Sequence, residues 1–328
     1  MANKNEYDYV FPSVLIRSKE VHLLGRSDLE KVAEQASVAD AMKVLAEYGY
    51  AGADADAALS AKLAEAYELV FSILPEDPGM KLFLYPNDYH NAKVLLKAEA
   101  LKQDPAAFTA DISSIPMDKM EEAIRKREFA IMSAFMKEAI SAASESFAKT
   151  GDPQEIDMIL DRACFADMLA EAEKLGNEFV IGYVKLLIDI LNMGAFIRLR
   201  KIGKSKNFFD KVFLGGGTFE EDFFKGAYEE SYASIADKVR YAGFGDVFTV
   251  GAEEVSQTGS FSTLEKIFDN LKIEYAKKCK YESFGLETTA AFLIATEMEV
   301  KNLRIILAGL GAKMSAEQIA ERLRETYV

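Results

Sequence analysis

Apolar residues recur every three or four positions along most of the chain, which is the spacing of one face of an α-helix. This pattern predicts helices over residues 28–48, 54–73, 87–103, 117–150, 153–175, 178–202, 219–242, 263–278, 285–308 and 316–325. The short stretch FGDVFTV at 244–250 has the composition of a strand instead. The sequence therefore predicts the all-α fold class.

Helix start and stop signals divide this pattern. A Ser, Thr or Asp followed three residues later by Glu or Gln predicts a helix N-terminus, because the two side chains satisfy unpaired backbone N–H groups. Such pairs occur at Ser27/Glu30, Asp152/Glu155, Thr218/Glu221, Ser262/Glu265 and Ser315/Gln318. Glycines fall where predicted helices should end, at Gly49, Gly151, Gly176, Gly203 and Gly309. Residues 117–150 contain no Gly or Pro and are predicted to form one very long helix.

The chain contains an internal repeat. Each copy has an acidic residue, two further residues, an Asn and then an apolar helical run, at Asp88/Asn91, Asp189/Asn192 and Glu299/Asn302. The Asn residues are 101 and 110 positions apart, and the second and third copies share an upstream aspartate, Asp161 or Asp269. The repeat predicts three similar helical units, residues 1–113, 114–214 and 215–328, arranged with pseudo-three-fold symmetry as one compact whole.

The acid and the Asn of each copy share one helix face, because residues i and i+3 are neighbours on a helix. Two interpretations follow. The Asn bonds a neighbouring chain segment and fixes how the repeat folds back, since a buried amide must be satisfied. Alternatively, the pairs line an axial cavity or an ion site.

Composition and charge exclude several classes of protein. The chain has 328 residues, with 39 Lys and Arg against 53 Asp and Glu and a net charge of −14. This balance argues against a nucleic-acid binder and against attachment to anionic lipid by overall charge. The N-terminal segment lacks the apolar run of a signal peptide, and the longest apolar stretch, 179–191, is interrupted by Lys185 and Asp189. We therefore expect a cytoplasmic protein without a membrane span.

No motif for catalysis or for a cofactor is evident. The two His residues, His22 and His90, are not in a metal-binding pattern, and Cys164 and Cys279 form no CxxC pair. The Gly-Gly-Gly-Thr segment at 215–218 lacks the Lys of a phosphate-binding loop. The sequence predicts a protein that is not an enzyme and has no cofactor and no metal.

A group of cations is concentrated near residue 200. Arg198, Arg200, Lys201, Lys204 and Lys206 lie within nine residues of an otherwise acidic chain. They either compensate the dipole at the end of the predicted helix or provide a docking site for an acidic surface. The sequence leaves both interpretations open.

The repeated elements resemble the C subunits of bacterial and archaeal V/A-type ATP synthases, a family that also includes the d subunit of eukaryotic vacuolar proton pumps. The resemblance covers essentially the whole length. It is carried by the segments 88–93, 189–198, 214–217, 299–304 and 314–319.

This resemblance implies a funnel-like helical protein with an axial cavity. It implies a non-catalytic rotor subunit, peripheral on the cytoplasmic side, that links central-stalk subunits D and F to the membrane proteolipid ring. ATP hydrolysis or synthesis would thereby be coupled to proton or sodium translocation, without nucleic-acid binding or direct membrane insertion. From repetition and polarity, we expect the partner-binding residues to be Asp88, Asn91, Asp189, Asn192, Arg198, Arg200, Lys201, Glu299, Asn302 and Arg304.

Two other classes of protein compete with this interpretation. One is a free-standing α-helical scaffold in the cytoplasm that binds other proteins. The other is an all-α, metal-dependent enzyme, which needs DDxxD-type clusters on facing helices. The sequence contains no such cluster, since Asp54 and Asp56 form only a small pair near a loop.

Overall fold

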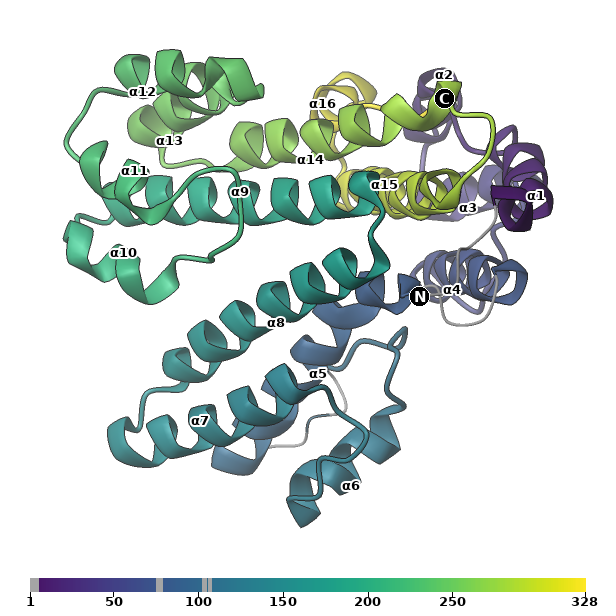
Figure 1. The fold of residues 1–328 in the computed structure, drawn as a ribbon. Helices are drawn as coiled ribbons and strands as arrows, with labels where there is room; N and C mark the ends of the chain where they lie inside the picture. The colour runs from purple at the N-terminus through teal and green to yellow at the C-terminus, as the bar shows by residue number, and fades with distance from the viewer. Residues whose placement is uncertain (1–5, 75–78, 102–104, 106–107) are drawn as a thin grey trace. The chain divides into compact units, whose positions relative to one another are not determined.

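The computed structural model describes residues 6–74, 79–101, 105 and 108–328, and this part of the chain is helical without any strand (Figure 1). The fold class is therefore all-α, as the sequence predicts. Contacts divide the chain into two compact units. Unit 1 comprises Met1–Pro78 and Glu230–Val328, and unit 2 comprises Gly79–Glu229.

Unit 1 brings the two ends of the chain together. Its N-terminal elements are the 3₁₀-helix η1 (Glu6–Tyr9), α1 (Val10–Glu20), α2 (Arg26–Ala33), α3 (Val38–Glu47) and α4 (Ala55–Ile73). Its C-terminal elements are α12 (Tyr232–Val239), η4 (Arg240–Ala242), η5 (Val247–Ala252), α13 (Glu253–Thr258), α14 (Ser262–Lys277), η6 (Lys278–Tyr281), α15 (Leu286–Gly311) and α16 (Ala316–Arg322).

The core of unit 1 forms between these two sets of helices. Leu29 and Leu45, from α2 and α3, are fully buried in one cluster with Leu303 and Ile306 of α15 and with Ile319 of α16. Burying a side chain of this size stabilises the fold by about 1.5–3 kcal/mol. The long helix α15 is buried along most of its length and is the centre of this packing.

Unit 2 is built from helices that are consecutive in sequence. They are η2 (Met80–Leu84), α5 (Tyr85–Leu101), α6 (Met117–Lys126), α7 (Ala134–Thr150), α8 (Pro153–Leu175), α9 (Glu178–Lys201), α10 (Lys206–Val212) and α11 (Glu221–Gly226). Helices α7 and α8 lie side by side (Figure 1). Around the end of α9, Phe196 packs against the rings of Phe209, Phe224 and Tyr228, which anchors the short helices α10 and α11.

The prediction of one helix over 117–150 is wrong, because the chain breaks between α6 and α7. Arg127 has a left-handed backbone with φ 59° and ends α6. Ser133 starts α7 by accepting a hydrogen bond from the N–H of Met136, and its hydroxyl also bonds Asp167 of α8. A tertiary contact thus places a helix start where the sequence has neither Gly nor Pro.

The strand-like stretch at 244–250 is also helical. Residues 247–252 form a π-helix, in which Val247, Phe248, Gly251 and Ala252 are buried. Gly251 lies so close to α14 that an added Cβ would be 2.7 Å from Leu264. The β-branched and aromatic residues therefore serve helix packing, because tertiary burial outweighs strand propensity.

Several predicted helix boundaries also change. Asp152 caps α8, and Ser315 and Gln318 form a capping box on α16, whereas Ser27, Thr218 and Ser262 cap no helix. The ranges 28–48 and 219–242 each contain two α-helices, while α1, α10 and α13 were not predicted. The predicted stop at Gly309 is wrong, since Gly309 lies within α15 and provides room for Ile319.

One helix of the described chain, α9, is long and apolar enough to cross a membrane by length and composition. Its most apolar window has a mean hydropathy of 1.7, and 56% of that window is buried inside the structure. The buried Asp189 and Asn192 near its middle bond backbone groups of residues 214–219. We interpret α9 as the core helix of unit 2, because its apolar surface already has protein neighbours.

Candidate functional site

Each repeat Asn forms the same pair of hydrogen bonds with the backbone of one later residue. Asn192 donates its Nδ2 to the carbonyl of Leu214 at 2.8 Å and accepts the N–H of Leu214 on Oδ1 at 2.9 Å. Asn91 holds Ala110 in the same way, at 3.1 and 2.7 Å. Asn302 holds Arg324 at 3.3 and 2.8 Å. The partners lie 19 to 22 residues downstream, so the amide fixes how the chain returns to its helix, as the first interpretation predicts.

The acids of the first two repeats hold the segment that follows this contact. Asp88 accepts the backbone N–H groups of Ser114 and Ile115 at 2.9 and 3.0 Å, and the hydroxyl of Ser114. Asp189 accepts the N–H groups of Thr218 and Phe219 at 2.8 and 3.3 Å. Each acid and its Asn together form a polar clamp on the returning chain.

The third clamp is completed from the other end of the protein. Glu299 accepts the backbone N–H of Leu24 and the hydroxyl of Tyr50. In the first two repeats the acid holds backbone groups 26 to 30 residues after it, whereas Glu299 holds groups of the N-terminal segment. An added Cβ on Gly25 would be 3.9 Å from the side chain of Val328, so the N-terminal segment lies close to the C-terminal residues.

All of these clamp side chains are buried, with exposed fractions of 7% or less. Burial raises the pKa of Asp88, Asp189 and Glu299, because a low-dielectric environment disfavours the charged carboxylate. The donated hydrogen bonds act in the opposite direction and compensate only in part. The chemical role of these clamps in the structure is to hydrogen-bond backbone groups of the same chain.

The upstream aspartate of the third repeat, Asp269, is buried. It bonds Arg324 at 2.9 Å and Lys301 at 2.6 Å. Burial would raise the pKa of Asp269, but Lys272, Lys301 and Arg324 lower it below its ordinary value. Sequence analysis did not identify Arg324, although its position 22 residues after Asn302 matches that of Leu214 after Asn192.

The cationic residues of the predicted set lie on the surface or close to it. Arg198 and Lys201 are exposed at the end of α9, and Arg304 is exposed on α15. Arg200 is half-buried, with its guanidinium 5.4 Å from the ring centre of Phe196. Partner binding by these four side chains stays a prediction, as it does for the six buried clamp residues.

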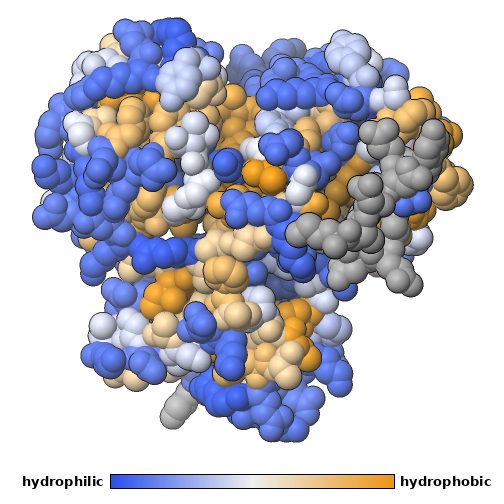
Figure 2. Space-filling model, viewed as in Figure 1, coloured by the Kyte–Doolittle hydropathy of each residue, from blue (hydrophilic) through white to orange (hydrophobic). Residues whose placement is uncertain are grey.

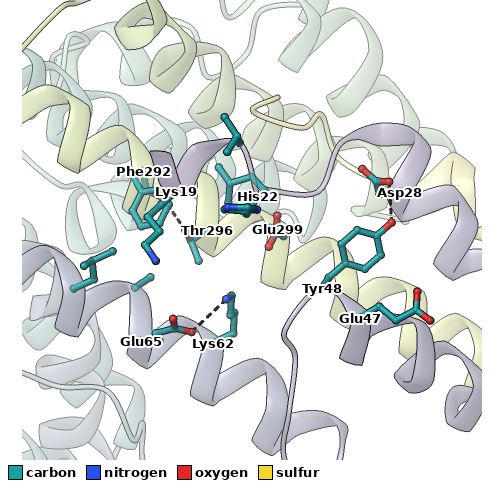
Figure 3. Close-up of a pocket in the computed structure, with 14 residues that line it drawn as sticks. Lys19, His22, Asp28, Glu47, Tyr48, Lys62, Glu65, Phe292, Thr296 and Glu299 are labelled. Atoms are coloured by element: carbon teal, nitrogen blue, oxygen red, sulfur yellow. Dashed lines mark hydrogen bonds and ion pairs between the residues drawn. The ribbon is translucent and has the colours of Figure 1, made fainter. Parts of the chain in front are cut away.

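Unit 1 also contains a pocket of about 330 Å³, between the end of α1, helix α4 and helix α15 (Figure 3). It is lined by Lys19, Val21, His22, Leu23, Asp28, Glu47, Tyr48, Lys62, Glu65, Ala66, Leu69, Phe292, Thr296 and Glu299. Asp28 accepts the hydroxyl of Tyr48, and Lys62 pairs with Glu65 at 3.2 Å. Sequence analysis missed this pocket, because its residues come from segments far apart in the chain.

The residues that line this pocket include no Ser or Cys, and its Tyr48 and Lys62 are each bonded to a carboxylate, that of Asp28 and that of Glu65. In the described ranges, no three His, Cys, Asp or Glu side chains are grouped so that they could hold a metal ion. His90 bonds the carbonyl of Phe108 at 2.8 Å, and Cys164 and Cys279 are buried free thiols.

Comparison with known proteins places this geometry in context. The profile of the family described as ATP synthase (C/AC39) subunit matches residues 12–322. The C subunit of the V-type sodium ATPase of Enterococcus hirae is 26% identical, over 98% of this chain and 99% of that protein.

Two archaeal relatives match with similar extent. The C subunit of the A-type ATP synthase of Methanocaldococcus jannaschii is 23% identical, over 96% of this chain and 86% of that protein. The C subunit of the A-type ATP synthase of Thermococcus onnurineus is 24% identical, over 95% and 89%. The family match therefore covers the clamp acid and Asn of all three repeats.

Proposed function

Because the chain belongs to the ATP synthase (C/AC39) subunit family, whose members are structural rather than catalytic subunits, we propose that it is the rotor coupling subunit of a V/A-type rotary ATPase. In this role it links central-stalk subunits D and F to the membrane proteolipid ring. ATP hydrolysis or synthesis is thereby coupled to proton or sodium translocation. The observation that carries the proposal is the match of the family over residues 12–322.

The proposed architecture is a funnel of three helical repeats, 1–113, 114–214 and 215–328, with pseudo-three-fold symmetry around an axial cavity. Its support is the clamp itself, which recurs with the same two Asn bonds at Asn91, Asn192 and Asn302. Because each clamp fixes one helix return, three equivalent returns supply the stiffness that torque transmission needs.

We propose that the partner-binding residues act in two ways. The buried acids and Asn residues shape the helix returns, while Arg198, Arg200, Lys201 and Arg304 provide charge at or near the surface for stalk or ring. Interfaces of this kind are no more apolar than ordinary protein surface, so exposed arginines suit them. The protein would be cytoplasmic and peripheral at the membrane.

The proposal is tested by a tagged pull-down from gently solubilised native membranes, with the co-purifying subunits identified by mass spectrometry. Recovery of the stalk subunits and the proteolipid ring would support it. Recovery of soluble proteins without any stalk or ring subunit would overturn it and favour the free-standing scaffold.

The same pull-down tests the cations. The variants Arg198→Glu and Arg304→Glu should each reduce recovery of stalk or ring subunits, because each reverses a charge at an exposed position. Arg125→Glu, on the exposed face of α6, is the matched control. If both variants retain every partner as the control does, those two arginines are not part of the interface.

A further inference from the structure

Helix α1 presents apolar side chains on two opposite faces. Its buried face includes Pro12, Ser13 and Ile16, which pack into unit 1. On the other side Phe11, Val14 and Val21 are 67%, 59% and 74% exposed. Positions 11, 14, 18 and 21 follow the spacing of one helix face, so these apolar residues share one outward stripe that the described chain leaves uncovered.

The turn between α14 and α15 lies against this helix. Ser13 bonds the backbone of Gly285, and the guanidinium of Arg17 donates to the carbonyls of Cys279 and Glu282. These bonds fix a turn in which Tyr281 is 91% exposed and Phe284 is 50% exposed. We call the apolar stripe of α1 together with Tyr281 and Phe284 the α1 edge; Figure 2 shows apolar side chains at the margin where Figure 1 places α1.

Exposed charges of both signs flank the α1 edge, with Lys19, Lys278 and Lys280 against Asp8 and Glu282. Lys278 and Lys280 are exposed in the same turn, against the exposed Glu282. Their ammonium groups lie 4.4 Å and 5.1 Å from the ring centres of Tyr275 and Tyr327, two rings that are not part of the α1 edge. The edge therefore combines exposed aromatic rings with exposed lysines, on a protein whose net charge is −14.

We propose that the α1 edge contacts the headgroup region of an anionic phospholipid bilayer. Tyrosine rings are favoured at the membrane–water interface, and exposed lysines are attracted to anionic headgroups. The overall negative charge does not prevent this contact, because screening limits electrostatic forces to about 8–10 Å at physiological salt. The contact rests on the proposed function in one respect, since membership of a membrane-bound ATPase brings the chain within reach of lipid.

A bilayer fits the edge better than a protein partner does. A protein-binding hot spot is a packed pocket surrounded by contacts that exclude water. Of the residues of the α1 edge, only Val21 lines the pocket of unit 1, and the turn leaves Tyr281 91% exposed. A soft interface of headgroups accepts such a projection without a complementary cavity, because amphipathic segments bind there by burying apolar area with electrostatic help.

The chain contains no Trp, so one introduced Trp reports on its own position. The variant Tyr281→Trp is mixed with vesicles of phosphatidylcholine, with or without phosphatidylglycerol. Its emission should shift to the blue with the anionic vesicles only. Tyr241→Trp, at a 79% exposed position in the same unit, is the matched control and should not shift.

Vesicle co-sedimentation measures how strongly each variant binds the anionic vesicles. Lys278→Glu with Lys280→Glu should weaken binding at least about 25-fold, since each lysine near an anionic surface accounts for about fivefold. Lys119→Glu with Lys137→Glu, at exposed positions of unit 2, makes the same charge change and should bind as the unmodified chain does. Tyr281→Ser with Phe284→Ser should also lose binding, and exposed positions allow both pairs to fold, which circular dichroism checks.

The proposal is overturned if Tyr281→Trp and Tyr241→Trp respond alike, or if the two lysine pairs weaken binding equally. These vesicles contain no ATPase subunit, so their outcome is independent of the pull-down. Membrane binding with no stalk recovery would separate lipid contact from the rotary role. Stalk recovery with no vesicle binding would reject the lipid contact and leave the proposed function intact.

Discussion

The backbone N–H of Leu24 donates a hydrogen bond to the carboxylate of Glu299, across 275 positions of sequence. Tyr50 donates its hydroxyl to the other oxygen of the same carboxylate. In the first two repeats the corresponding acid holds a segment that follows it, around residues 114–115 and 218–219. In the third repeat the N-terminal segment occupies the corresponding place.

The bonds from the N-terminal segment to Glu299 help to explain why unit 1 contains both ends of the chain. Helices α2 and α3 pack on α15 and α16, much as α6 and α7 pack on α5 in unit 2. The core around Leu29, Leu303 and Ile319 therefore joins residues that are remote in sequence. Such non-local packing is expected to form late in folding, because closing a long loop costs entropy before its contacts form.

The clamp of the second repeat can be tested at Asn192. The change Asn192→Ala leaves the buried N–H and C=O of Leu214 without their partners. Each unsatisfied buried group costs about 1–3 kcal/mol, so with two such groups we expect the free energy of unfolding to fall by about 2–6 kcal/mol. Urea denaturation followed by circular dichroism measures this change.

The control for this variant is Asn207→Ala, at an exposed position on α10. It removes the same amide and should change the free energy of unfolding by less than about 0.5 kcal/mol. Equal effects at both positions would mean that the amide bonds to Leu214 contribute nothing specific.

Gly217 provides a second test of the same clamp. An added Cβ would lie 2.4 Å from Oδ1 of Asp189 and 3.0 Å from the side chain of Ile188. Gly217→Ala should therefore push Asp189 away from Thr218 and destabilise unit 2 by about 1–3 kcal/mol, the usual cost of overpacking. Gly215→Ala is the matched control, since no atom lies within 4 Å of its added Cβ. If the two variants unfold at the same urea concentration, Gly217 is not needed for close approach.

Much of the fold could be predicted from the sequence because helical periodicity is local. The ranges of α4, α8, α9 and α14 agree with the predicted ones to within a residue or two. The break at Ser133 and the π-helix at 247–252 could not be predicted this way, since both depend on contacts with distant helices. Helix α1 was not predicted, because its apolar residues occupy two faces and so obscure the helical periodicity.

The candidate site could also be predicted only in part from the sequence. Repetition identified Asp88, Asn91 and their counterparts, because polar residues inside apolar helices are conspicuous. It could not identify what they bind, since the partners are backbone groups of Ala110, Leu214 and Arg324 and carry no residue signature. The hydrogen bond from the backbone N–H of Leu24 to Glu299 could not be predicted for the same reason.

Breaking the buried ion pair between Asp269 and Arg324 should strongly destabilise the protein. The exposed fractions of the two side chains are 3% and 8%, so Arg324→Met leaves a buried carboxylate with only its lysine partners. Breaking such a pair costs about 3–5 kcal/mol. Because Lys301 and Lys272 remain, we expect a loss near the lower end, about 3 kcal/mol. Lys43→Met, which breaks the exposed pair with Asp40, is the control and should lower stability far less than Arg324→Met in thermal or urea unfolding.

Glu299 predicts a distinctive pH dependence of stability. Burial raises the pKa of Glu299 above its ordinary value, although bonds from Tyr50 and Leu24 and the charge of Lys62 act against this. The folded state therefore holds a proton that the unfolded state releases, and the contribution of Glu299 to stability falls as the pH rises from about 4.3 through the folded pKa. Glu299→Gln cannot titrate, so unmodified chain minus variant should give a stability difference that decreases with rising pH.

This difference is measured by urea unfolding between acid and neutral pH, with Glu34→Gln at the exposed end of α2 as the matched control. Subtracting each variant from the unmodified chain at every pH removes the titration of all other groups, including Asp88 and Asp189, whose pKa burial also raises. A difference that is constant, or that grows with pH, would mean that Glu299 is charged in the folded protein without penalty. In that case the bonds from Leu24 and Tyr50 fully offset the cost of burying its carboxylate.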